Sequence, residues 1–214
     1  MEVPHYPQPS PEINWTNPPD CGRDGNTMSE TSVQSESVPS PASILIVGAG
    51  GHGHVVAELA RACGYSRIDF ADDRSPGAAG ALSDIPSLAP RYSATAVSIG
   101  NLPLRKALLD RLASLPVPIP ALVHPASTVS PSAQIGPGAL VLPGAIVHTN
   151  AVVGMGAIIS AGAVIDHDAV VGPCAHVDAG AVVAARASVP PLTKVPAGTC
   201  VRPDSPINAG GGIK

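Results

Sequence analysis

The chain has 214 residues, a formal net charge of −4 and only 13% charged residues. This acidic balance argues against a polyanionic partner such as nucleic acid, and no apolar run approaches the ~20 residues that a membrane-spanning helix needs. The four cysteines form no CxxC pair and no dense framework, so the sequence predicts neither a zinc site nor a disulfide scaffold. The first residues lack the basic and apolar regions of a secretory signal, and we therefore expect a protein of the cytoplasm.

Residues 1–42 are rich in Pro, Ser, Asn and Glu and show neither the period of a strand nor that of a helix. Such a segment buries too little apolar surface to offset the entropy that is lost on ordering it. We expect residues 1–42 to form a disordered leader.

Residues 43–120 alternate short apolar runs with helical patterns. The run over 44–47 ends in a glycine-rich loop over 48–53, and an amphipathic pattern that stops near Gly64 predicts a helix after this loop. Strands that alternate with helices form parallel sheets with right-handed crossovers. The segment is therefore predicted to be a small Rossmann-like βαβ domain. Its remaining predicted elements are strands over 67–73 and 96–101 and a helix over 103–115.

The glycine-rich loop has the spacing Gly48-x-Gly50-x-x-Gly53, and acidic residues near Asp72 follow about 20 positions later. This pattern fits a dinucleotide-binding fingerprint, in which the backbone approaches an anion at a helix N-terminus. Because a domain of about 80 residues is half of a full dinucleotide fold, we expect a mononucleotide or a nucleotide-sugar rather than NAD. His52 either reaches a pyrophosphate or occupies a turn, and the sequence leaves both interpretations open.

Residues 121–207 carry a six-residue repeat. An aliphatic residue recurs every six positions from Val123 to Ile207, fifteen times in succession, and a small residue stands two positions before each one. In a strand, positions i−2 and i share a face, so each hexad supplies one short strand with two inward side chains. Such a repeat predicts a parallel β-helix of about five triangular coils. No aromatic residue lies beyond Tyr92, as expected for a core of small aliphatic rungs, and residues 208–214 are expected to form a flexible tail.

The position just before each inward aliphatic residue is also apolar in most hexads. Residues 18 apart stack on one face, so all three faces of the prism are expected to carry apolar groups. Because monomers rarely expose patches of this size, we expect self-association, most simply as a cyclic oligomer. The outward residues are Leu140, Ile146, Val152, Ile158, Val164, Val170 and Val182, with His176 as the interruption.

Charged residues are scarce in the repeat region, and two of them flank His167. One interpretation is a general base whose basicity a neighbouring carboxylate raises. The other is a polar turn on a solvated corner, and composition alone favours neither. The charged residues between positions 121 and 201 are Asp166, Asp168, Asp178, Arg186 and Lys194.

A metal triad of His148, His167 and His176 is possible in principle. Their spacings of 19 and 9 residues, however, do not stack three imidazoles on one face. No metal site is therefore predicted.

An ordered set of motifs resembles one family. The chain contains Gly48-Ala-Gly-Gly-His-Gly-His54, Asp72-Asp73, Ser98-Ile-Gly-Asn101, His124-Pro-Ala-Ser and Ile165-Asp-His-Asp-Ala-Val-Val-Gly172, followed by His176. Together they resemble the bacterial sugar acetyltransferases of the left-handed β-helix type, which acetylate UDP- or GDP-linked 4-amino-sugars and include relatives of the sialic-acid O-acetyltransferases. The resemblance covers about residues 44–183.

This resemblance implies a left-handed β-helix after a nucleotide-sugar domain, a homotrimer with active sites between adjacent prisms, and acetyl-CoA as co-substrate with no bound cofactor. It makes His167 the general base that takes a proton from the sugar amine during direct attack on the thioester, with Asp168 as the acid that raises its basicity. By the same resemblance, substrate contacts fall on Gly51, His52, Gly53, Asp73, Arg74, Gly100 and Asn101, and acetyl-CoA contacts on His176 and Ala185.

The chain departs from the family pattern at two of these places. Ala185 stands where a glycine that the cofactor approaches is expected, and His54 replaces the usual Lys after the glycine-rich loop. Lys194 and Arg202 could offer charge to the CoA phosphates. The sequence thus predicts an acetyl-CoA-dependent N-acetyltransferase of a nucleotide-linked amino-sugar. The alternatives are O-acetylation of a sugar or sialic acid, and a trimeric scaffold that binds nucleotide-sugar with weak or no transfer.

Overall fold

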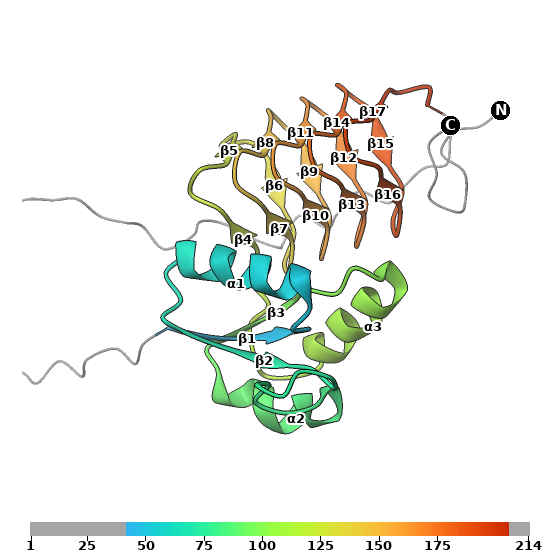
Figure 1. The fold of residues 1–214 in the computed structure, drawn as a ribbon. Helices are drawn as coiled ribbons and strands as arrows, with labels where there is room; N and C mark the ends of the chain where they lie inside the picture. Colours follow the sequence, from blue (N-terminus) through green and yellow to red (C-terminus); the bar gives the residue numbers. More distant parts are fainter. Residues whose placement is uncertain (1–41, 206–214) are drawn as a thin grey trace, which may run out of the picture. The chain divides into compact units, whose positions relative to one another are not determined.

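The computed structural model describes residues 42–205, which comprise an α/β part and a stack of two-residue strands (Figure 1). The predicted leader, except for its last residue, the predicted tail, and the last two residues of the final hexad, including Ile207, lie outside the described residues. No helix within 42–205 is long and apolar enough to cross a membrane.

The α/β part contains a parallel sheet of three strands in the order β2-β1-β3. These strands are β1 (Ser43–Val47), β2 (Arg67–Ala71) and β3 (Ala94–Val97). The central strand β1 is buried because its alternate residues enter two different apolar clusters: Ile44 and Ile46 pack on the side of helix α1, and Leu45 and Val47 on the side of helix α3. The expected Rossmann-like arrangement is confirmed.

The two predicted helices of this part are present in the predicted order, and three short helical elements occur in addition. Helix α1 spans Gly51–Ala62 and α3 spans Leu102–Ala113, and the predicted strands over 67–73 and 96–101 end earlier, at Ala71 and Val97. Between these two strands the chain forms three short helical elements that were not predicted from the sequence, because each is too short to show a helical period of apolar residues. They are η1 (Leu82–Asp84), α2 (Ile85–Leu88) and η2 (Ala89–Arg91).

Up to residue 205, where the description ends, the repeat region forms fourteen two-residue parallel strands in three sheets. The sheet orders are β16-β13-β10-β7-β4, β17-β14-β11-β8-β5 and β15-β12-β9-β6, so the described chain makes between four and five coils. Partners are 18 residues apart, as in the pairing of Ile158 with Leu140 on one side and His176 on the other. The strands are β4 (Leu122–Val123), β5 (Thr128–Val129), β6 (Gln134–Ile135), β7 (Leu140–Val141), β8 (Ile146–Val147), β9 (Val152–Val153), β10 (Ile158–Ile159), β11 (Val164–Ile165), β12 (Val170–Val171), β13 (His176–Val177), β14 (Val182–Val183), β15 (Ser188–Val189), β16 (Lys194–Val195) and β17 (Cys200–Val201).

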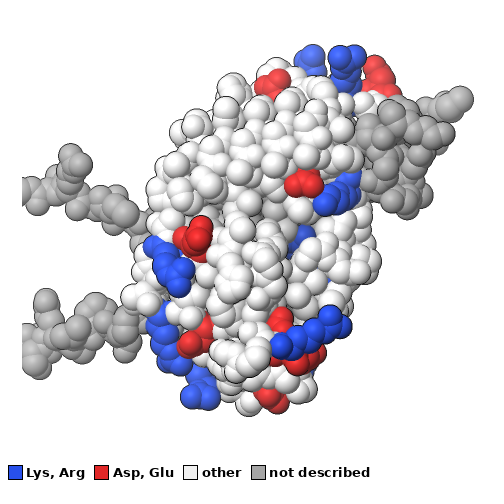
Figure 2. All heavy atoms as spheres, viewed as in Figure 1, with Lys and Arg blue, Asp and Glu red and all other residues white. Residues whose placement is uncertain are grey.

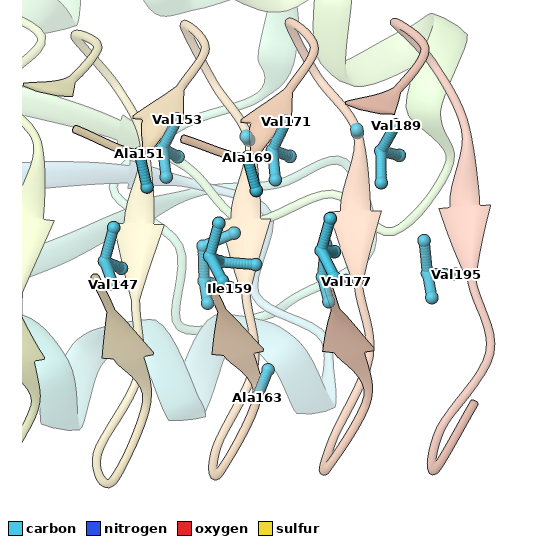
Figure 3. Close-up of a cluster of buried hydrophobic side chains, with 14 of the residues drawn as sticks. Val147, Ala151, Val153, Ile159, Ala163, Ala169, Val171, Val177, Val189 and Val195 are labelled. Carbon is cyan, nitrogen blue, oxygen red and sulfur yellow. The ribbon is translucent and has the colours of Figure 1, made fainter. Parts of the chain in front are cut away.

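The inward positions follow the repeat (Figure 3). From Ala139 to Val201 the small and aliphatic residues of successive hexads form one buried cluster, in which Ile159 and Val177 are completely buried. At the N-terminal end, Val123 and Ile135 are only partly buried, because no coil precedes them. The small inward residues, each 0% exposed, are Ala139, Ala145, Ala151, Ala157, Ala163, Ala169, Ala175, Ala181 and Ala187.

The outward positions are apolar on all three faces, but one of these faces is not available for self-association. Leu122, Leu140 and Ile158 lie on the face of β4, β7 and β10, and each is at most 1% exposed because this face packs against β1 and α1. The chain's own α/β part therefore covers one of the three apolar faces. The other two faces keep exposed aliphatic groups, such as Ile146 on β8 and Val170 on β12.

The packing of α3 on the β-helix can be tested with two glycines of the corner turns. Gly156 and Gly162 have the same backbone conformation, with φ of 65° and 68°, but an added Cβ overlaps Leu109 of α3 at Gly156 and meets nothing within 4 Å at Gly162. We expect Gly162→Ala to lower the free energy of unfolding by about 1 kcal/mol through its φ alone. Gly156→Ala should cost a further ~1–3 kcal/mol from overpacking. Equal costs in urea unfolding would contradict the packing of Leu109 on this corner.

Candidate active site

The imidazole of His167 lies in the turn between β11 and β12, at an exposed corner of the β-helix. Its Nδ1 is 2.8 Å from Oδ2 of Asp168, and its backbone N–H donates to Oδ1 of Asp166 at 2.7 Å. The ring of His148 lies edge-on to it, with 6.5 Å between the centroids. The two carboxylates thus have different tasks, because Asp166 shapes the turn and Asp168 holds the ring.

The carboxylate of Asp168 accepts two hydrogen bonds. Besides the bond from His167, its Oδ1 accepts from Nδ2 of Asn150 at 3.1 Å. The bond from His167, followed by that from Asn150, lowers the pKa of Asp168. Asp168 therefore stays ionised in neutral solution and can stabilise a positive charge on the imidazole.

Ala185 and Arg186 lie one coil beyond this corner. The strands before the two turns pair Ile165 with Val183, so the 18-residue register puts Ala185 next to His167 and Arg186 next to Asp168. The backbone N–H of Arg186 donates to the carbonyl of His167 at 3.0 Å. Two residues that the sequence analysis assigned to different roles, His167 and Ala185, are thus brought to one corner.

A second polar cluster surrounds His176 on β13, on the face that packs against α1. Nε2 of His176 is 3.0 Å from Oγ of Ser160 and 3.9 Å from Oδ1 of Asp178, and its ring centroid is 6.3 Å from that of His52. Burial is the largest cause that lowers the pKa of His176, to about 4. His176 is therefore a neutral imidazole at neutral pH. Its partner Ser160 was not among the residues predicted from the sequence.

This cluster is not a Ser-His-Asp triad, although it contains all three residue types. In a triad the carboxylate holds the ring nitrogen opposite to the one that faces the hydroxyl. Ser160 and Asp178 both face Nε2 of His176. The arrangement therefore does not activate Ser160 as a nucleophile.

The expected substrate loop is partly helix. Because α1 begins at Gly51, residues Gly51, His52 and Gly53 form its first turn, and no side chain caps this N-terminus. A Cβ at Gly53 would collide with the carbonyl oxygen of Gly48, so the backbone approach requires glycine here. Free N–H groups at a helix N-terminus can bind an anion.

The remaining predicted substrate residues are exposed, and two already make structural contacts. Oδ1 of Asp73 accepts from the backbone N–H of Leu82 at 2.8 Å, and Oδ1 of Asn101 caps α3 by accepting from Leu104 at 2.9 Å. Arg74 and Gly100 lie near them on the surface.

Asp72 joins two loops of the α/β part. Its Oδ2 accepts from the N–H of Ala49 in the glycine-rich loop at 2.9 Å, and its Oδ1 accepts from the N–H of Arg74 at 2.8 Å. The bond from Ala49, followed by that from Arg74, lowers the pKa of Asp72. Asp72 therefore holds the glycine-rich loop in place rather than facing a ligand.

Arg105 is a buried charge that no sequence pattern predicted. The residue is 1% exposed, and its three guanidinium nitrogens have no hydrogen-bond partner within residues 42–205. Burial lowers the pKa of Arg105 to about 10, and its charge in turn helps to lower the pKa of His52, for which burial is the larger cause. The charge of Arg105 therefore helps to keep His52 neutral.

Of the two basic residues considered for CoA phosphates, one forms an ion pair within the chain and the other is exposed. Nζ of Lys194 forms an ion pair with Oδ2 of Asp178 at 3.1 Å, directly beside His176 in the strand register. The side chain of Arg202 is exposed near the end of the described chain.

The three histidines considered for a metal site do not form one cluster. Within residues 42–205 no three His, Cys, Asp or Glu side chains are arranged to hold a metal ion, and the ring of His148 lies beside that of His167.

The burial of His176 predicts a pH dependence of stability. Because its pKa is depressed in the folded state, the unfolded chain binds more protons between pH 6.5 and about 4. Stability should therefore be complete above pH 6.5 and should fall as the pH is lowered toward 4, with a slope of at most ~1.4 kcal/mol per pH unit from this group. Replacing His176 by Asn should flatten urea-unfolding free energies measured across this window, whereas the exposed His148→Asn control should not. An unchanged slope in His176→Asn would contradict this burial effect.

Comparisons with known proteins agree with this architecture. The PglD N-terminal domain family matches residues 43–112, and the bacterial transferase hexapeptide family, with six repeats, matches residues 132–167. No curated protein sequence matches the chain.

Several solved structures are similar. The acetyltransferase domain of PglB from Neisseria gonorrhoeae is 35% identical, with a TM-score of 0.71, over 74% of this chain and 81% of that one. The same domain in complex with acetyl coenzyme A is 31% identical, with a TM-score of 0.57, over 74% and 90%. PerB from Caulobacter crescentus, in complex with CoA and GDP-perosamine, is 30% identical, with a TM-score of 0.68, over 82% and 98%. The chain therefore belongs to the hexapeptide-repeat sugar acyltransferases with a PglD N-terminal domain, and it is an acyltransferase.

Proposed function

We propose that the protein transfers an acetyl group from acetyl-CoA to the amine of a nucleotide-linked amino-sugar, with His167 as the general base. The observation that carries this proposal is the bond between Nδ1 of His167 and Oδ2 of Asp168 on an exposed corner. It leaves Nε2 as the ring nitrogen that can accept a proton. The complexes of PerB with CoA and GDP-perosamine, and of PglB with acetyl coenzyme A, support the two substrates.

The proposed reaction is a direct displacement. The amine nitrogen attacks the thioester carbonyl carbon, the C–S bond breaks, and the amine proton passes to Nε2 of His167 and then to the leaving thiolate. Asp168, ionised and hydrogen-bonded to Nδ1, stabilises the imidazolium that forms. Neither Ser160 nor Cys174 is suited to form a covalent acyl-enzyme, because Ser160 is not activated and Cys174 is completely buried, which raises the pKa of its thiol.

We assign residues 43–120 to the nucleotide-sugar and residues 121–207 to acetyl transfer. The uncapped N-terminus of α1, at Gly51, His52 and Gly53, suits a diphosphate, and Asp73, Arg74, Gly100 and Asn101 complete the sugar-nucleotide contacts. His176 and Ala185 are assigned to acetyl-CoA. Both proposed substrates place the reaction in the cytoplasm.

Two separated groups support a site shared between subunits. His167 follows β11, whereas His176 lies on β13 in another sheet and faces His52. We infer a homotrimer in which the His167 corner of one subunit lies beside the open edge of the His176 cluster of the next, where the side chain of Lys194 is exposed. The two uncovered apolar faces of the β-helix supply the contact surface.

Assembly can be tested by placing charges on these faces. The double variant Ile146→Lys, Val170→Lys alters two outward aliphatic residues, which are 36% and 41% exposed. Because buried unpaired charges are costly, it should sediment as a monomer at micromolar concentration, where the wild type sediments as a trimer. Val55→Lys, at a similarly exposed aliphatic residue of α1, is the control and should remain trimeric. A monomeric wild type would remove the shared-site proposal.

The base can be tested by release of CoA thiol with a panel of UDP- and GDP-linked amino-sugars. His167→Ala should lower turnover by ~10²-fold or more, the range for loss of a general base, with unchanged circular dichroism. His124→Ala is the matched control, because Nδ1 of His124 accepts a hydrogen bond from the N–H of Ala126 within its own turn, after β4, and no role in the reaction is assigned to it. A fully active His167→Ala would overturn the assignment. Activity only with hydroxyl acceptors would favour O-acetylation, and none with any acceptor would favour a scaffold.

A further inference from the structure

The corners of the β-helix differ in which residues adopt the left-handed backbone conformation. From residue 138 to residue 198 this conformation recurs every six residues, and one column of corners, 18 residues apart, consists of glycine throughout. A second column starts with glycine and then holds Cys174 and Leu192. The third column has no glycine and holds Asn150, Asp168 and Arg186, with φ of 56°, 57° and 61°. The all-glycine column is Gly144, Gly162, Gly180 and Gly198.

Side chains in this conformation are less favourable than glycine, although Asn and Asp tolerate it better than most. Three polar side chains stacked on one corner therefore point to a use for them there. This corner is also the one that carries His167, in the residue before Asp168.

A chain of hydrogen bonds crosses three coils and ends at the imidazole. Oγ of Ser132 accepts from the backbone N–H of Asn150 at 3.1 Å. Nδ2 of Asn150 donates to Oδ1 of Asp168 at 3.1 Å, and the other oxygen, Oδ2, is 2.8 Å from Nδ1 of His167. Each carboxylate oxygen of Asp168 thus has its own partner: Oδ1 is bonded to Asn150 on the preceding coil, and Oδ2 to His167 on the same turn.

We propose that Asn150 is a positioning residue, which holds the Asp168 carboxylate in the orientation that keeps His167 aligned as a base. The proposal rests on the function assigned above to His167. The side chains of His167 and Asp168 are 44% and 47% exposed, so packing alone does not fix them. A bond from Asn150 to Oδ1 stops the carboxylate from rotating and keeps Oδ2 on Nδ1–H. The tautomer with the proton on Nδ1 then presents a free lone pair on Nε2.

Other charged or titratable groups also face this pair. Asp166 accepts from the backbone of His167, His148 lies edge-on to the ring, and Arg186 on the next coil adds positive charge beside Asp168. None of these groups donates to Oδ1 of Asp168, which is the contact that Asn150 supplies within the described chain.

Two substitutions separate the amide's contact from its backbone conformation. Asn150→Gly keeps the left-handed corner and removes the donor, and Asn150→Asp keeps the shape but replaces the donor with an acceptor. We expect Asn150→Gly to lower kcat by about five- to tenfold, with both KM values within twofold and an unchanged Tm. Asn150→Asp should lower kcat as well and should move the acid limb of the kcat pH profile upward, because a second carboxylate favours the imidazolium.

The decisive measurement is a double-mutant cycle with Asp168→Ala. If Asn150 acts through Asp168, then Asn150→Gly changes kcat by less than twofold in the Asp168→Ala background. A similar loss of kcat in both backgrounds would show a merely structural role and would overturn the proposal, as would a wild-type kcat for Asn150→Gly. His167→Ala, measured in parallel, distinguishes the failures: if it is fully active the proposed function itself fails, and if it is inactive while Asn150→Gly matches wild type, only the positioning role fails.

Discussion

The candidate site depends on the hydrogen bonds that join each coil of the β-helix to the next. In every coil the N–H of an outward strand residue donates to a carbonyl 17 residues later, as in the bonds from Val164 to Ala181 and from Val170 to Ala187, both 2.9 Å long. This ladder fixes the 18-residue register of the backbone. Polar side chains at one corner are consequently stacked at a constant spacing, and the group around His167 is a product of that register.

The ladder in turn depends on small inward side chains. Ala alternates with Val or Ile through a core that is too narrow for aromatic side chains. This explains why the repeat contains no aromatic residue. The α/β part attaches to this rod along one face, where Leu140 and Ile158 pack against its sheet and Leu109 of α3 joins the cluster that includes Cys174. This attachment brings the first turn of α1 to His176 and places the two proposed substrate regions within one chain.

Much of this architecture could be predicted from the sequence, because a strict six-residue repeat dictates which residues point inward. The pairing of His167 with Asp168 was also predictable, since neighbouring residues in a tight turn lie close together. The burial of Leu140 and Ile158 was not, because residues that face another part of the same chain have the same composition as residues that face a partner. The burial of the Arg105 guanidinium could not be predicted either, because no local sequence pattern indicates it.

Other features lay within reach of the sequence but were missed. Asn150 stands 18 residues before Asp168, and the coil length alone would have placed the two side chains together. The same reasoning links His167 to Ala185. By contrast, the short helices over 82–91 follow from tertiary packing of Ile85 and Leu88, which no periodicity of so short a segment could indicate.

A crystal structure of the protein with CoA and a nucleotide-linked amino-sugar would test the central claim most directly. We predict that Nε2 of His167 lies within hydrogen-bond distance, about 3 Å, of the acceptor amine, with the open edge of the His52 and His176 cluster of a neighbouring subunit forming the opposite wall. An imidazole turned away from both ligands, or ligands bound far from the His167 corner, would contradict it.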